Sequence, residues 1–593
     1  MRAAAGPIGT ALFVAALVAV PFVAPPFWVT LGNYIGLYSM VALGLVLLTG
    51  VAGQTSFGQA AFVGLGAYTT AFLTTHYGTS PWLTLPAGLV LTFLVALALG
   101  FITLRMKGHY LPLATIAWGI SIALLFGNID ALGGHTGVTG IPALSIGRFD
   151  LKDERHFYLL IWLITLVALW ATGNLLDSRP GRALRALKGG FEMAEAFGVN
   201  GARLKIVAFV YAALLACISG WLYAHLQRFV NPTPFDIRAG IEYLFMAVVG
   251  GAGSVWGAIV GAALITVLRQ MLQDILPALL GRAGNFEIVV FGVLMILLLQ
   301  FSRNGVWPWI AHLLPRAKPA AVSRAALLAP REKPRPTGRA MLEVRGVRKV
   351  FGGLVAVNDL SFDIRPGEIL GLIGPNGAGK STTFALISGA LRLSAGEIAF
   401  CGESIGSRAP YRIARLGIGR TFQHVRLLPH MTVLDNVALG AYVRGRAGVV
   451  RAALRLDRAE ERRTRAVAAR ELERVGLAAH MHDDAGSLPL GQQRIVEIAR
   501  ALAADPSLLL LDEPAAGLRY LEKRALAELL RTLRREGMTI LLVEHDMEFV
   551  MGLTDRLIVM DFGEKLAEGA PQAIQRDPRV LEAYLGSVAE VAA

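Results

Sequence analysis

Residues 368–382 read EILGLIGPNGAGKST, and this stretch determines the fold expected for the second half of the chain. An apolar run at its start predicts a buried strand, and the residues at its end begin a helical pattern. The motif Gly374-x-x-x-x-Gly379-Lys380-Ser381 therefore joins a strand to a helix. Glycines in such a loop let successive backbone N–H groups turn toward phosphate oxygens, and the helix N-terminus adds positive potential. The stretch predicts a phosphate-binding loop in an α/β domain.

The polar residues of this loop have distinct expected roles in binding ATP. Lys380 is expected to reach the outer phosphates, and the hydroxyl of Ser381 is expected to ligate Mg²⁺. The residues that we predict to contact the nucleotide in this loop are Gly374, Asn376, Gly377, Gly379, Lys380, Ser381 and Thr382.

The second half of the same site is expected at the end of a buried strand. The run LLLLDEP contains four leucines, typical of a parallel strand covered on both faces, followed by Asp512 and Glu513. We expect Asp512 to hold hydrated Mg²⁺ and Glu513 to polarise the attacking water. Another buried strand, in TILLVEHD, ends at His545, which is placed to approach a γ-phosphate.

The first half of the chain has a different composition. The sequence is 54% hydrophobic and 17% charged overall, and residues 3–104 contain no Asp, Glu, Lys or Arg. Since about 20 apolar residues cross a bilayer, these features predict an all-α, polytopic membrane domain. Candidate spans lie near 8–29, 30–50, 57–75, 82–104, 111–127, 157–176, 206–228, 241–268 and 285–301.

Basic loops predict the orientation of these spans. If Arg2 is inside, the loop with Arg105 and Lys107 and the basic stretch 179–205 both fall on the cytoplasmic side, in agreement with the positive-inside rule. The chain must also be inside by Arg303, because an ATPase follows. Residues 241–268 contain GGAGS, so we expect either two crossings or a re-entrant segment there. The total is then ten or eight spans.

A basic segment separates the two halves. Residues 302–340 contain six prolines and eight Lys or Arg against one acid, so they are expected to act as a tether. We therefore predict three parts: a membrane domain over 1–302, a linker over 303–340 and an ATP-binding domain over 341–593. The Arg-rich run 444–474 alternates charged and apolar residues at helical spacing, which favours a solvated helical subdomain over nucleic-acid binding.

Residues 341–593 resemble the nucleotide-binding subunit of an ABC transporter, an α/β P-loop ATPase with a helical subdomain. The resemblance implies that Phe351 stacks on adenine and that Gln423 is the Q-loop residue, which takes part in catalysis and contacts Mg²⁺. It also makes His545 the switch histidine. The signature loop that clasps ATP on a partner domain is then Leu488 to Gln492, with Leu488, Gly491 and Gln492 as its contacts.

Other stretches resemble one branch of these transporters, the branched-chain amino acid importers. They are RTFQHVRLLPHMTVLDNV, LDEPAAGL and VLEAYLG in the ATPase half, and GQTSFGQAAFVGLGAYTTA and GGHTGVTGIP in the membrane half. Residues 179–200 resemble the cytoplasmic segment on which an importer's ATPase docks, and we expect Glu192 and the short helix around it to dock near Gln423. Covalent fusion of permease and ATPase departs from the family's separate subunits.

The signature also departs from the family pattern. It reads LPLGQ where related ATPases have LSGGQ, so Pro489 removes a hydroxyl and a backbone N–H. One lost hydrogen bond to phosphate costs about 1.5 to 3 kcal/mol, so the loop is expected to be weakened rather than inactive. Arg519 and Tyr520 stand where related importers tend to carry Asn-Pro or Asp.

These observations predict a fused permease and ATPase of the bacterial inner membrane that imports branched-chain or related amino acids. The expected partners are a second permease subunit, a second ATPase subunit, an external solute-binding protein and the lipid bilayer, without nucleic acid. Urea, amides and other small solutes are alternative substrates, because they use similar permeases. A homodimeric exporter is a weaker alternative, since it typically has six long spans and a fuller signature. A non-transporting, membrane-anchored ATPase regulator is another, since it would not need eight to ten spans or the loop that resembles a docking segment.

Overall fold

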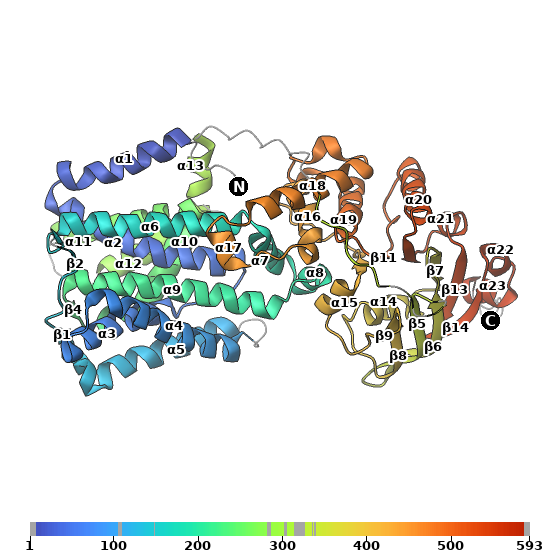
Figure 1. Ribbon diagram of the computed structural model, residues 1–593, viewed down its shortest axis with the longest axis horizontal. Helices are drawn as coiled ribbons and strands as arrows, with labels where there is room; N and C mark the ends of the chain where they lie inside the picture. Colours follow the sequence, from blue (N-terminus) through green and yellow to red (C-terminus); the bar gives the residue numbers. More distant parts are fainter. Residues whose placement is uncertain are drawn as a thin grey trace. The chain divides into compact units, whose positions relative to one another are not determined.

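The chain forms two compact units, each assembled from several stretches of sequence (Figure 1). The computed structural model describes residues 7–104, 110–147, 149–280, 286–301, 305–313, 327–334, 336, 338 and 340–585. The helical unit comprises residues 1–177, 202–319 and 449–455, and the α/β unit comprises 178–201, 320–448 and 456–593. Of the residues used above to predict orientation, Arg2, Arg105, Lys107 and Arg303 lie outside the described ranges, as does part of the predicted linker.

Apolar helices build the helical unit. Six described segments are long and apolar enough to cross a membrane: Pro26–Val51, Pro81–Thr103, Tyr110–Asn128, Glu154–Leu176, Gly201–Gln227 and Val255–Ile275. The unit's helices are Pro7–Val23 (α1), Pro26–Leu45 (α2) continued by a π-helix over Val46–Val51, Gln59–Tyr77 (α3), Pro81–Thr103 (α4), Tyr110–Asn128 (α5), Glu154–Leu176 (α6), Gly201–Gln227 (α9), Ile237–Gly251 (α10), Val255–Leu280 (α11), Phe286–Phe301 (α12), Trp307–Leu313 (α13) and Val449–Ala453 (α17). Short strands Val138–Thr139 (β1) and Phe229–Val230 (β4) pair, as do Ser145–Ile146 (β2) and Phe149–Asp150 (β3).

The glycine-rich break predicted within 241–268 separates α10 from α11. The two helices pack as an antiparallel pair, because a Cβ on Gly250 would lie 1.8 Å from the Gly257 carbonyl oxygen. Farther along the pair, a Cβ on Gly261 would lie 1.8 Å from the Met246 carbonyl oxygen. Only glycine permits this approach. An antiparallel pair fits either two crossings or a re-entrant hairpin, and of the two helices only α11 contains a segment long and apolar enough to cross a membrane, Val255–Ile275.

The α/β unit contains two sheets. The six-stranded sheet has the order β10-β11-β12-β7-β13-β14 and is parallel except for the last pair. Its strands are Ile418–Arg420 (β10), Leu508–Asp512 (β11), Thr539–Val543 (β12), Ile369–Ile373 (β7), Arg556–Asp561 (β13) and Glu564–Gly569 (β14). An antiparallel sheet of order β6-β5-β8-β9 consists of Leu354–Ile364 (β6), Leu342–Phe351 (β5), Ala395–Phe400 (β8) and Glu403–Ser404 (β9).

The central strands of the parallel sheet place the site. Every residue of β7, β11 and β12 is buried, as expected for strands with both faces covered. Asp512 pairs with Val543, and Val543 pairs with Leu372, so these three strands end together. Loops that leave the carboxyl ends of neighbouring parallel strands converge on one edge of the sheet, where ligands bind in open α/β folds.

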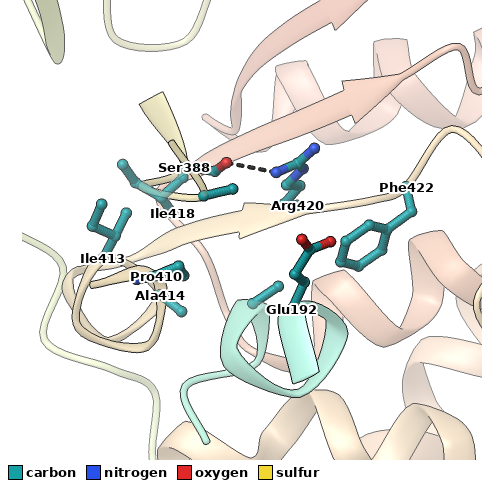
Figure 2. Close-up of a pocket in the computed structure, with 10 residues that line it drawn as sticks. Glu192, Ser388, Pro410, Ile413, Ala414, Ile418, Arg420 and Phe422 are labelled. Carbon is teal, nitrogen blue, oxygen red and sulfur yellow. Dashed lines mark hydrogen bonds between the residues drawn. The ribbon is translucent and has the colours of Figure 1, made fainter. Parts of the chain in front are cut away.

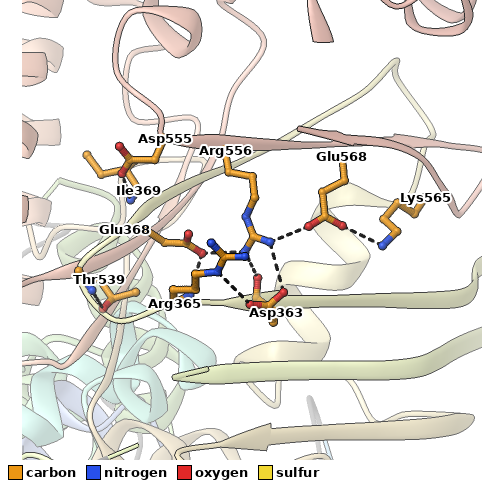
Figure 3. Close-up of polar contacts among 10 residues, drawn as sticks. Asp363, Arg365, Glu368, Ile369, Thr539, Asp555, Arg556, Lys565 and Glu568 are labelled. Atoms are coloured by element: carbon orange, nitrogen blue, oxygen red, sulfur yellow. Dashed lines mark hydrogen bonds and ion pairs between the residues drawn. The ribbon is translucent and has the colours of Figure 1, made fainter. Parts of the chain in front are cut away.

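An arginine cluster fixes the opposite edge of this sheet (Figure 3). Arg556, at the start of β13, donates hydrogen bonds to Glu368 (2.8 Å) and Glu568 (2.6 Å) and to the backbone oxygen of Asp363 (2.5 Å). Asp555 accepts a hydrogen bond from the backbone N–H of Ile369 at 2.9 Å. The cluster therefore ties β6, β13 and β14 together beside the start of β7, the strand that leads into the phosphate loop.

Helices surround the two sheets of the α/β unit. They are Arg179–Gly189 (α7), Phe191–Ala196 (α8), Lys380–Ile387 (α14), Pro410–Leu416 (α15), Val433–Gly440 (α16), Arg458–Arg474 (α18), Leu490–Ala503 (α19), Tyr520–Arg535 (α20), Met547–Met551 (α21), Pro571–Ile574 (α22) and Pro578–Leu585 (α23). The predicted helical subdomain is present as α16, α18 and α19. The prediction for 444–474 was wrong over 449–455, because α17 belongs to the helical unit, where Asn174 Nδ2 donates to the Ala453 carbonyl oxygen at 3.2 Å.

Candidate functional site

The phosphate loop has the conformation that its glycines allow. Gly374, Gly377 and Gly379 have φ angles of 151°, 85° and 93°. A Cβ on Gly374 would lie 2.1 Å from the Met560 carbonyl oxygen, so this position excludes any side chain. The loop leaves β7 and enters α14 at Lys380, which places the helix N-terminus at the loop as predicted.

Lys380 is held against the loop. Its Nζ donates to the carbonyl oxygens of Gly374 and Pro375, at 2.8 Å each. Burial lowers the pKa of this ammonium group, and the negative charge of Glu513 partly offsets that effect. A cation in this position suits an anionic phosphate. Ser381 is exposed beside it, and Asn376 and Gly377 are exposed at the tip of the loop.

Three predicted side chains that are far apart in sequence meet where β11 ends. Gln423 Nε2 donates to Glu513 Oε1 at 3.0 Å, and His545 Nε2 lies 2.8 Å from the same oxygen. A bond to a carboxylate requires His545 Nε2 to carry the proton. Both partners therefore hold the Glu513 carboxylate through one oxygen, and among the residues that the structure describes no hydrogen bond occupies the second oxygen.

The backbone at Glu513 is strained. Its φ angle is 47°, in the left-handed region that residues with a side chain rarely adopt. Its N–H donates to the Val543 carbonyl oxygen and its own carbonyl oxygen accepts from Arg494 Nη1, both at 2.9 Å. Arg494 lies in α19, the helix that follows the signature. Strand β12 and the signature helix therefore fix the orientation of this carboxylate.

Asp512 has the character of a cation ligand. Its side chain is buried, and its Oδ1 has no hydrogen-bond partner among the residues that the structure describes. Its Oδ2 lies 3.9 Å from an Arg420 nitrogen. Burial raises the pKa of Asp512, and Arg420 opposes that effect. A buried, unpaired carboxylate oxygen beside a phosphate loop fits a hard divalent cation such as Mg²⁺.

The signature residues lie at the start of α19. Pro489 is the residue before the helix and supplies no side-chain cap. A Cβ on Gly491 would lie 2.8 Å from Glu522 Oε1, so glycine allows α20 to approach. Within the described part of the chain, no hydrogen bond joins Leu488, Gly491 or Gln492 to the phosphate loop of the same chain. The action of the signature on a partner's nucleotide stays a prediction.

The aromatic residue predicted to stack on adenine is exposed. Phe351 ends β5, and 43% of its surface is accessible. Lys349 Nζ lies 4.9 Å from the centre of its ring, a cation–π contact that orients the side chain. An exposed ring at the end of a strand can stack on a base, so the stacking role stays a prediction.

Residues 178–201 form part of the α/β unit. Helix α7 is attached by Arg182, whose two terminal nitrogens bond to the Glu461 carboxylate at 2.7 and 3.1 Å. Both side chains are buried, with 4% and 5% of their surface exposed. Arg179 adds hydrogen bonds to the carbonyl oxygens of Tyr442 (2.8 Å) and Ala447 (2.9 Å). The segment that connects α6 to α9 is thus anchored in the helical subdomain.

Helix α8 docks near Gln423, which confirms the predicted position of Glu192. Glu192 forms an ion pair with Arg426 at 3.2 Å. Figure 2 shows Glu192 beside Phe422 and Arg420 at a small pocket between α8, α15 and β10. Arg420 donates to Ser388 Oγ at 2.6 Å, and burial lowers the pKa of its guanidinium.

Sequence reasoning missed a buried pair beneath α8. Glu497 accepts hydrogen bonds from Arg500 Nη2 and from the Arg426 backbone N–H, both at 2.8 Å. Arg500 is fully buried, donates to the Arg426 carbonyl oxygen at 2.9 Å and lies 4.6 Å from the centre of the Phe197 ring. The sequence did contain a signal for this pair, because Glu497 and Arg500 are opposite charges three residues apart that interrupt the apolar run of α19.

A tyrosine near the C-terminus was also missed. Tyr584, in α23, lies close enough to the backbone of Gly374 for that backbone to lower its pKa slightly. Burial raises the pKa of this tyrosine to about 12, so it is neutral at physiological pH. The motif VLEAYLG was recognised as a family feature, but its contact with the phosphate loop spans two hundred residues and leaves no local pattern.

Comparison with known proteins gives three family matches. Residues 28–299 match the branched-chain amino acid transport system permease component, residues 357–516 match the ABC transporter family, and residues 564–590 match the branched-chain amino acid ATP-binding cassette transporter family. The last two models fall in the α/β unit, and the first covers most of the helical unit.

Curated relatives match the second half of the chain over nearly their full length. The high-affinity branched-chain amino acid transport ATP-binding protein LivG of Escherichia coli (strain K12) is 42% identical over 249 residues, which cover 42% of this chain and 98% of the relative. BraF of Pseudomonas aeruginosa, with the same described role, is 40% identical over 251 residues and is covered to 98%. A solved nucleotide-free ATP-binding cassette of an ABC transporter shares 31% identity, with a TM-score of 0.37 over 42% of this chain and all of that one. The chain belongs to the branched-chain amino acid ABC transporter family and carries a permease component and an ATP-binding cassette in one polypeptide.

Proposed function

We propose that the chain is the fused permease and ATPase subunit of an ATP-driven importer of branched-chain amino acids. It is a multi-pass membrane protein with a cytoplasmic ATPase. The amino-acid substrate is inferred from the printed roles of its relatives, LivG and BraF.

The docked segment 178–201 carries this proposal. An ATPase that was merely tethered to the membrane would need no loop of the permease within its own fold. Here α7 and α8 belong to the compact α/β unit, and a buried ion pair between Arg182 and Glu461 holds them there. Movement of the ATPase is therefore transmitted to α6 and α9, the two apolar helices that flank the segment.

The chemistry follows from the converging side chains. Glu513 acts as the general base, and its free carboxylate oxygen takes the proton of the attacking water. Gln423 and His545 orient that carboxylate through the other oxygen. Lys380 binds the phosphates that the loop cradles. Bound Mg²⁺, ligated by Asp512, Ser381 and Gln423, would neutralise charge on the transferred phosphoryl group.

The proposed assembly includes subunits beyond this chain. Family membership implies a further permease and an external solute-binding protein, and two-nucleotide sandwiches require a second ATPase domain with its own signature. Affinity purification of the full chain from native membranes should recover these subunits. Urea and amides remain the alternative substrates, and a binding screen on the co-purified solute-binding protein separates them from leucine, isoleucine and valine.

The test is uptake of labelled leucine by the assembled complex in proteoliposomes with ATP inside or outside. We expect uptake only when ATP is on the side of the α/β unit. We expect Glu513→Gln to bind ATP normally but to lose hydrolysis and uptake by about 10²-fold or more, since general-base catalysis contributes about 10² to 10⁴. Wild-type hydrolysis in Glu513→Gln would refute the assignment of the base.

A further inference from the structure

An irregular stretch separates two apolar helices of the helical unit, between the predicted spans near 30–50 and 57–75. Helix α2 passes into the π-helix Val46–Val51, and the chain is then non-helical until α3 begins at Gln59. In a membrane, non-helical backbone is tolerated only where protein buries it or where it lines a cavity. π-Helices are also frequent at functional sites. The interruption at residues 52–58 is therefore a candidate site.

Protein surrounds this interruption on two sides. The Phe57 backbone N–H donates to Thr115 Oγ1 of α5 at 3.2 Å. A Cβ on Gly240 of α10 would lie 2.1 Å from the Phe57 carbonyl oxygen, and a Cβ on Gly50 would lie 1.6 Å from the carbonyl oxygen of Ala252, in the α10–α11 break. Both breaks read Gly-x-x-Ser in the sequence, as GQTS and GAGS. The two broken elements thus meet inside the bundle, an arrangement typical of transporter binding sites.

The interruption carries polar groups that the protein does not satisfy. Gln54 and Gln59 are buried, with 3% and 1% of their surface exposed. Neither amide atom of Gln54, nor Oε1 of Gln59, has a hydrogen-bond partner in the described part of the chain. Gln59 Nε2 lies 3.5 Å from Ser56 Oγ, which joins these groups into one cluster. Unpaired buried amides destabilise a fold, so their presence points to a ligand that pairs with them.

A cavity adjoins this cluster at Ser56, whereas its lining residues do not include Gln54 or Gln59. Its lining combines hydroxyl groups with large apolar side chains from α3, α4, α5 and α9, namely Ser56, Gly58, Ala61, Phe62, Leu99, Thr103, Thr115, Trp118, Gly119, Ile122 and Phe209. As closed in this structure, it has room for little more than a water molecule. An amino acid could enter only when α3 moves relative to α4 and α5, as alternating access requires.

We propose that the residue 52–59 interruption and this cavity form the substrate site of the permease, which recognises a free amino acid with a branched apolar side chain. The proposal rests on the proposed function. Gln54, Ser56 and Gln59 bind the α-ammonium and α-carboxylate groups, and the wall that includes Phe62 and Ile122 receives the side chain. The N-terminal end of α3, which begins at Gln59, favours the carboxylate.

The first test measures leucine uptake by the assembled complex in proteoliposomes, together with thermal stability. We expect Gln54→Leu and Ser56→Ala to raise the KM for uptake by about tenfold or more, because a polar ligand then loses its partners. The melting temperature of Gln54→Leu should equal or exceed that of the wild type, since the variant removes an unpaired buried amide. Ser39→Ala is the matched control, because Ser39 is equally buried but donates to Ile35 of its own helix at 2.6 Å. It should take up leucine normally.

Two results would overturn the proposal in this test. One is wild-type KM in both site variants. The other is a decrease in the melting temperature of Gln54→Leu that equals or exceeds the decrease in Ser39→Ala, together with a proportional loss of uptake. Gln54 would then be a structural residue.

A second test separates failure of this site from failure of the proposed function. Ser56→Cys, in a background with Cys217→Ala and Cys401→Ala, is treated with 2-aminoethyl methanethiosulfonate with and without ATP turnover. We expect modification of Ser56→Cys during turnover and none at Ser39→Cys. If the wild type imports no branched-chain amino acid, the proposed function fails, and this labelling still decides the site. Absence of labelling at Ser56→Cys during turnover overturns the proposal whatever the substrate.

Discussion

Removing one partner of the Arg182–Glu461 pair should separate the docked segment 178–201, the permease loop, from the ATPase. The pair is bidentate, and each side chain exposes 5% of its surface or less. Arg182→Met leaves the Glu461 carboxylate buried without its partner, which costs about 3 to 5 kcal/mol. For a unit of this size, 1 kcal/mol shifts the melting temperature by about 2 to 4 °C, so we expect a decrease of roughly 6 to 20 °C.

A double-mutant cycle isolates the pair from other effects of the substitutions. Replacing both residues, in Arg182→Met with Glu461→Leu, removes both charges from the buried site, and such replacements are often neutral in stability. The double variant should therefore recover most of the lost melting temperature. Arg426→Gln is the matched control on the exposed Glu192–Arg426 pair, where a loss of at most about 1 kcal/mol is expected.

The assay combines thermal unfolding of the purified complex with the ratio of leucine uptake to ATP hydrolysis. We expect Arg182→Met to hydrolyse ATP while the uptake per ATP falls. An unchanged melting temperature in Arg182→Met, or a double variant as unstable as the single one, would refute the claim that this buried pair anchors the loop.

Three further predictions address the nucleotide site and the docked helix. Pro489→Ser should raise ATP affinity or turnover at the partner's phosphate loop by up to about tenfold. The gain should be equal in a Lys380→Ala background, and a gain that vanishes there would mean that the signature acts on its own chain's nucleotide. Burial raises the pKa of Glu195 in α8 to about 7 from the usual 4.5, so protonation of this carboxyl stabilises the folded state, and the stabilisation is lost as pH rises from about 4.5 through about 7. Melting curves should show that Glu195→Gln removes this pH dependence, and a pH profile identical to that of the wild type would contradict the prediction. Tyr584→Phe should weaken ATP binding by about two- to tenfold in equilibrium titrations, because the Tyr584 hydroxyl lies near the backbone of Gly374 in the phosphate loop, and unaltered affinity would show that this proximity is incidental.

Features that depend on local sequence were predicted, and contacts between distant segments were not. The strand, the glycine loop and the helix from Ile369 onward are encoded in consecutive residues, and the structure has them there. The basic run 179–205 indicated a cytoplasmic loop, but nothing in it distinguishes Arg182 from its basic neighbours. Its partner Glu461 is 279 residues away, in a helix that also carries other acids. The choice of pair is made by packing.

The position of α17 shows the same limit. Residues 449–455 have a helical pattern like the rest of the Arg-rich run, so composition assigned them to the solvated subdomain. In the structure they pack on α6, where Asn174 bonds to Ala453. Sequence patterns give the period of a helix but not the element that its face contacts, because exposed and protein-covered apolar residues look alike in one sequence.

Residues 423–426 connect the ATP site to the permease loop within four positions of the chain. Gln423 bonds to the carboxylate of Glu513, and Arg426 pairs with Glu192 of α8. The backbone of Arg426 is bonded at both its N–H and its carbonyl group to Glu497 and Arg500 of the signature helix. Any change that moves the Glu513 carboxylate, such as its engagement with water and phosphate, therefore pulls on a segment that α8 and α19 both hold. Because Arg500 is buried and Glu497 is its charged partner, we expect a displacement at Gln423 to pass to α8 instead of being absorbed locally. The same backbone bonds connect this segment to α19, the helix that begins at the predicted signature.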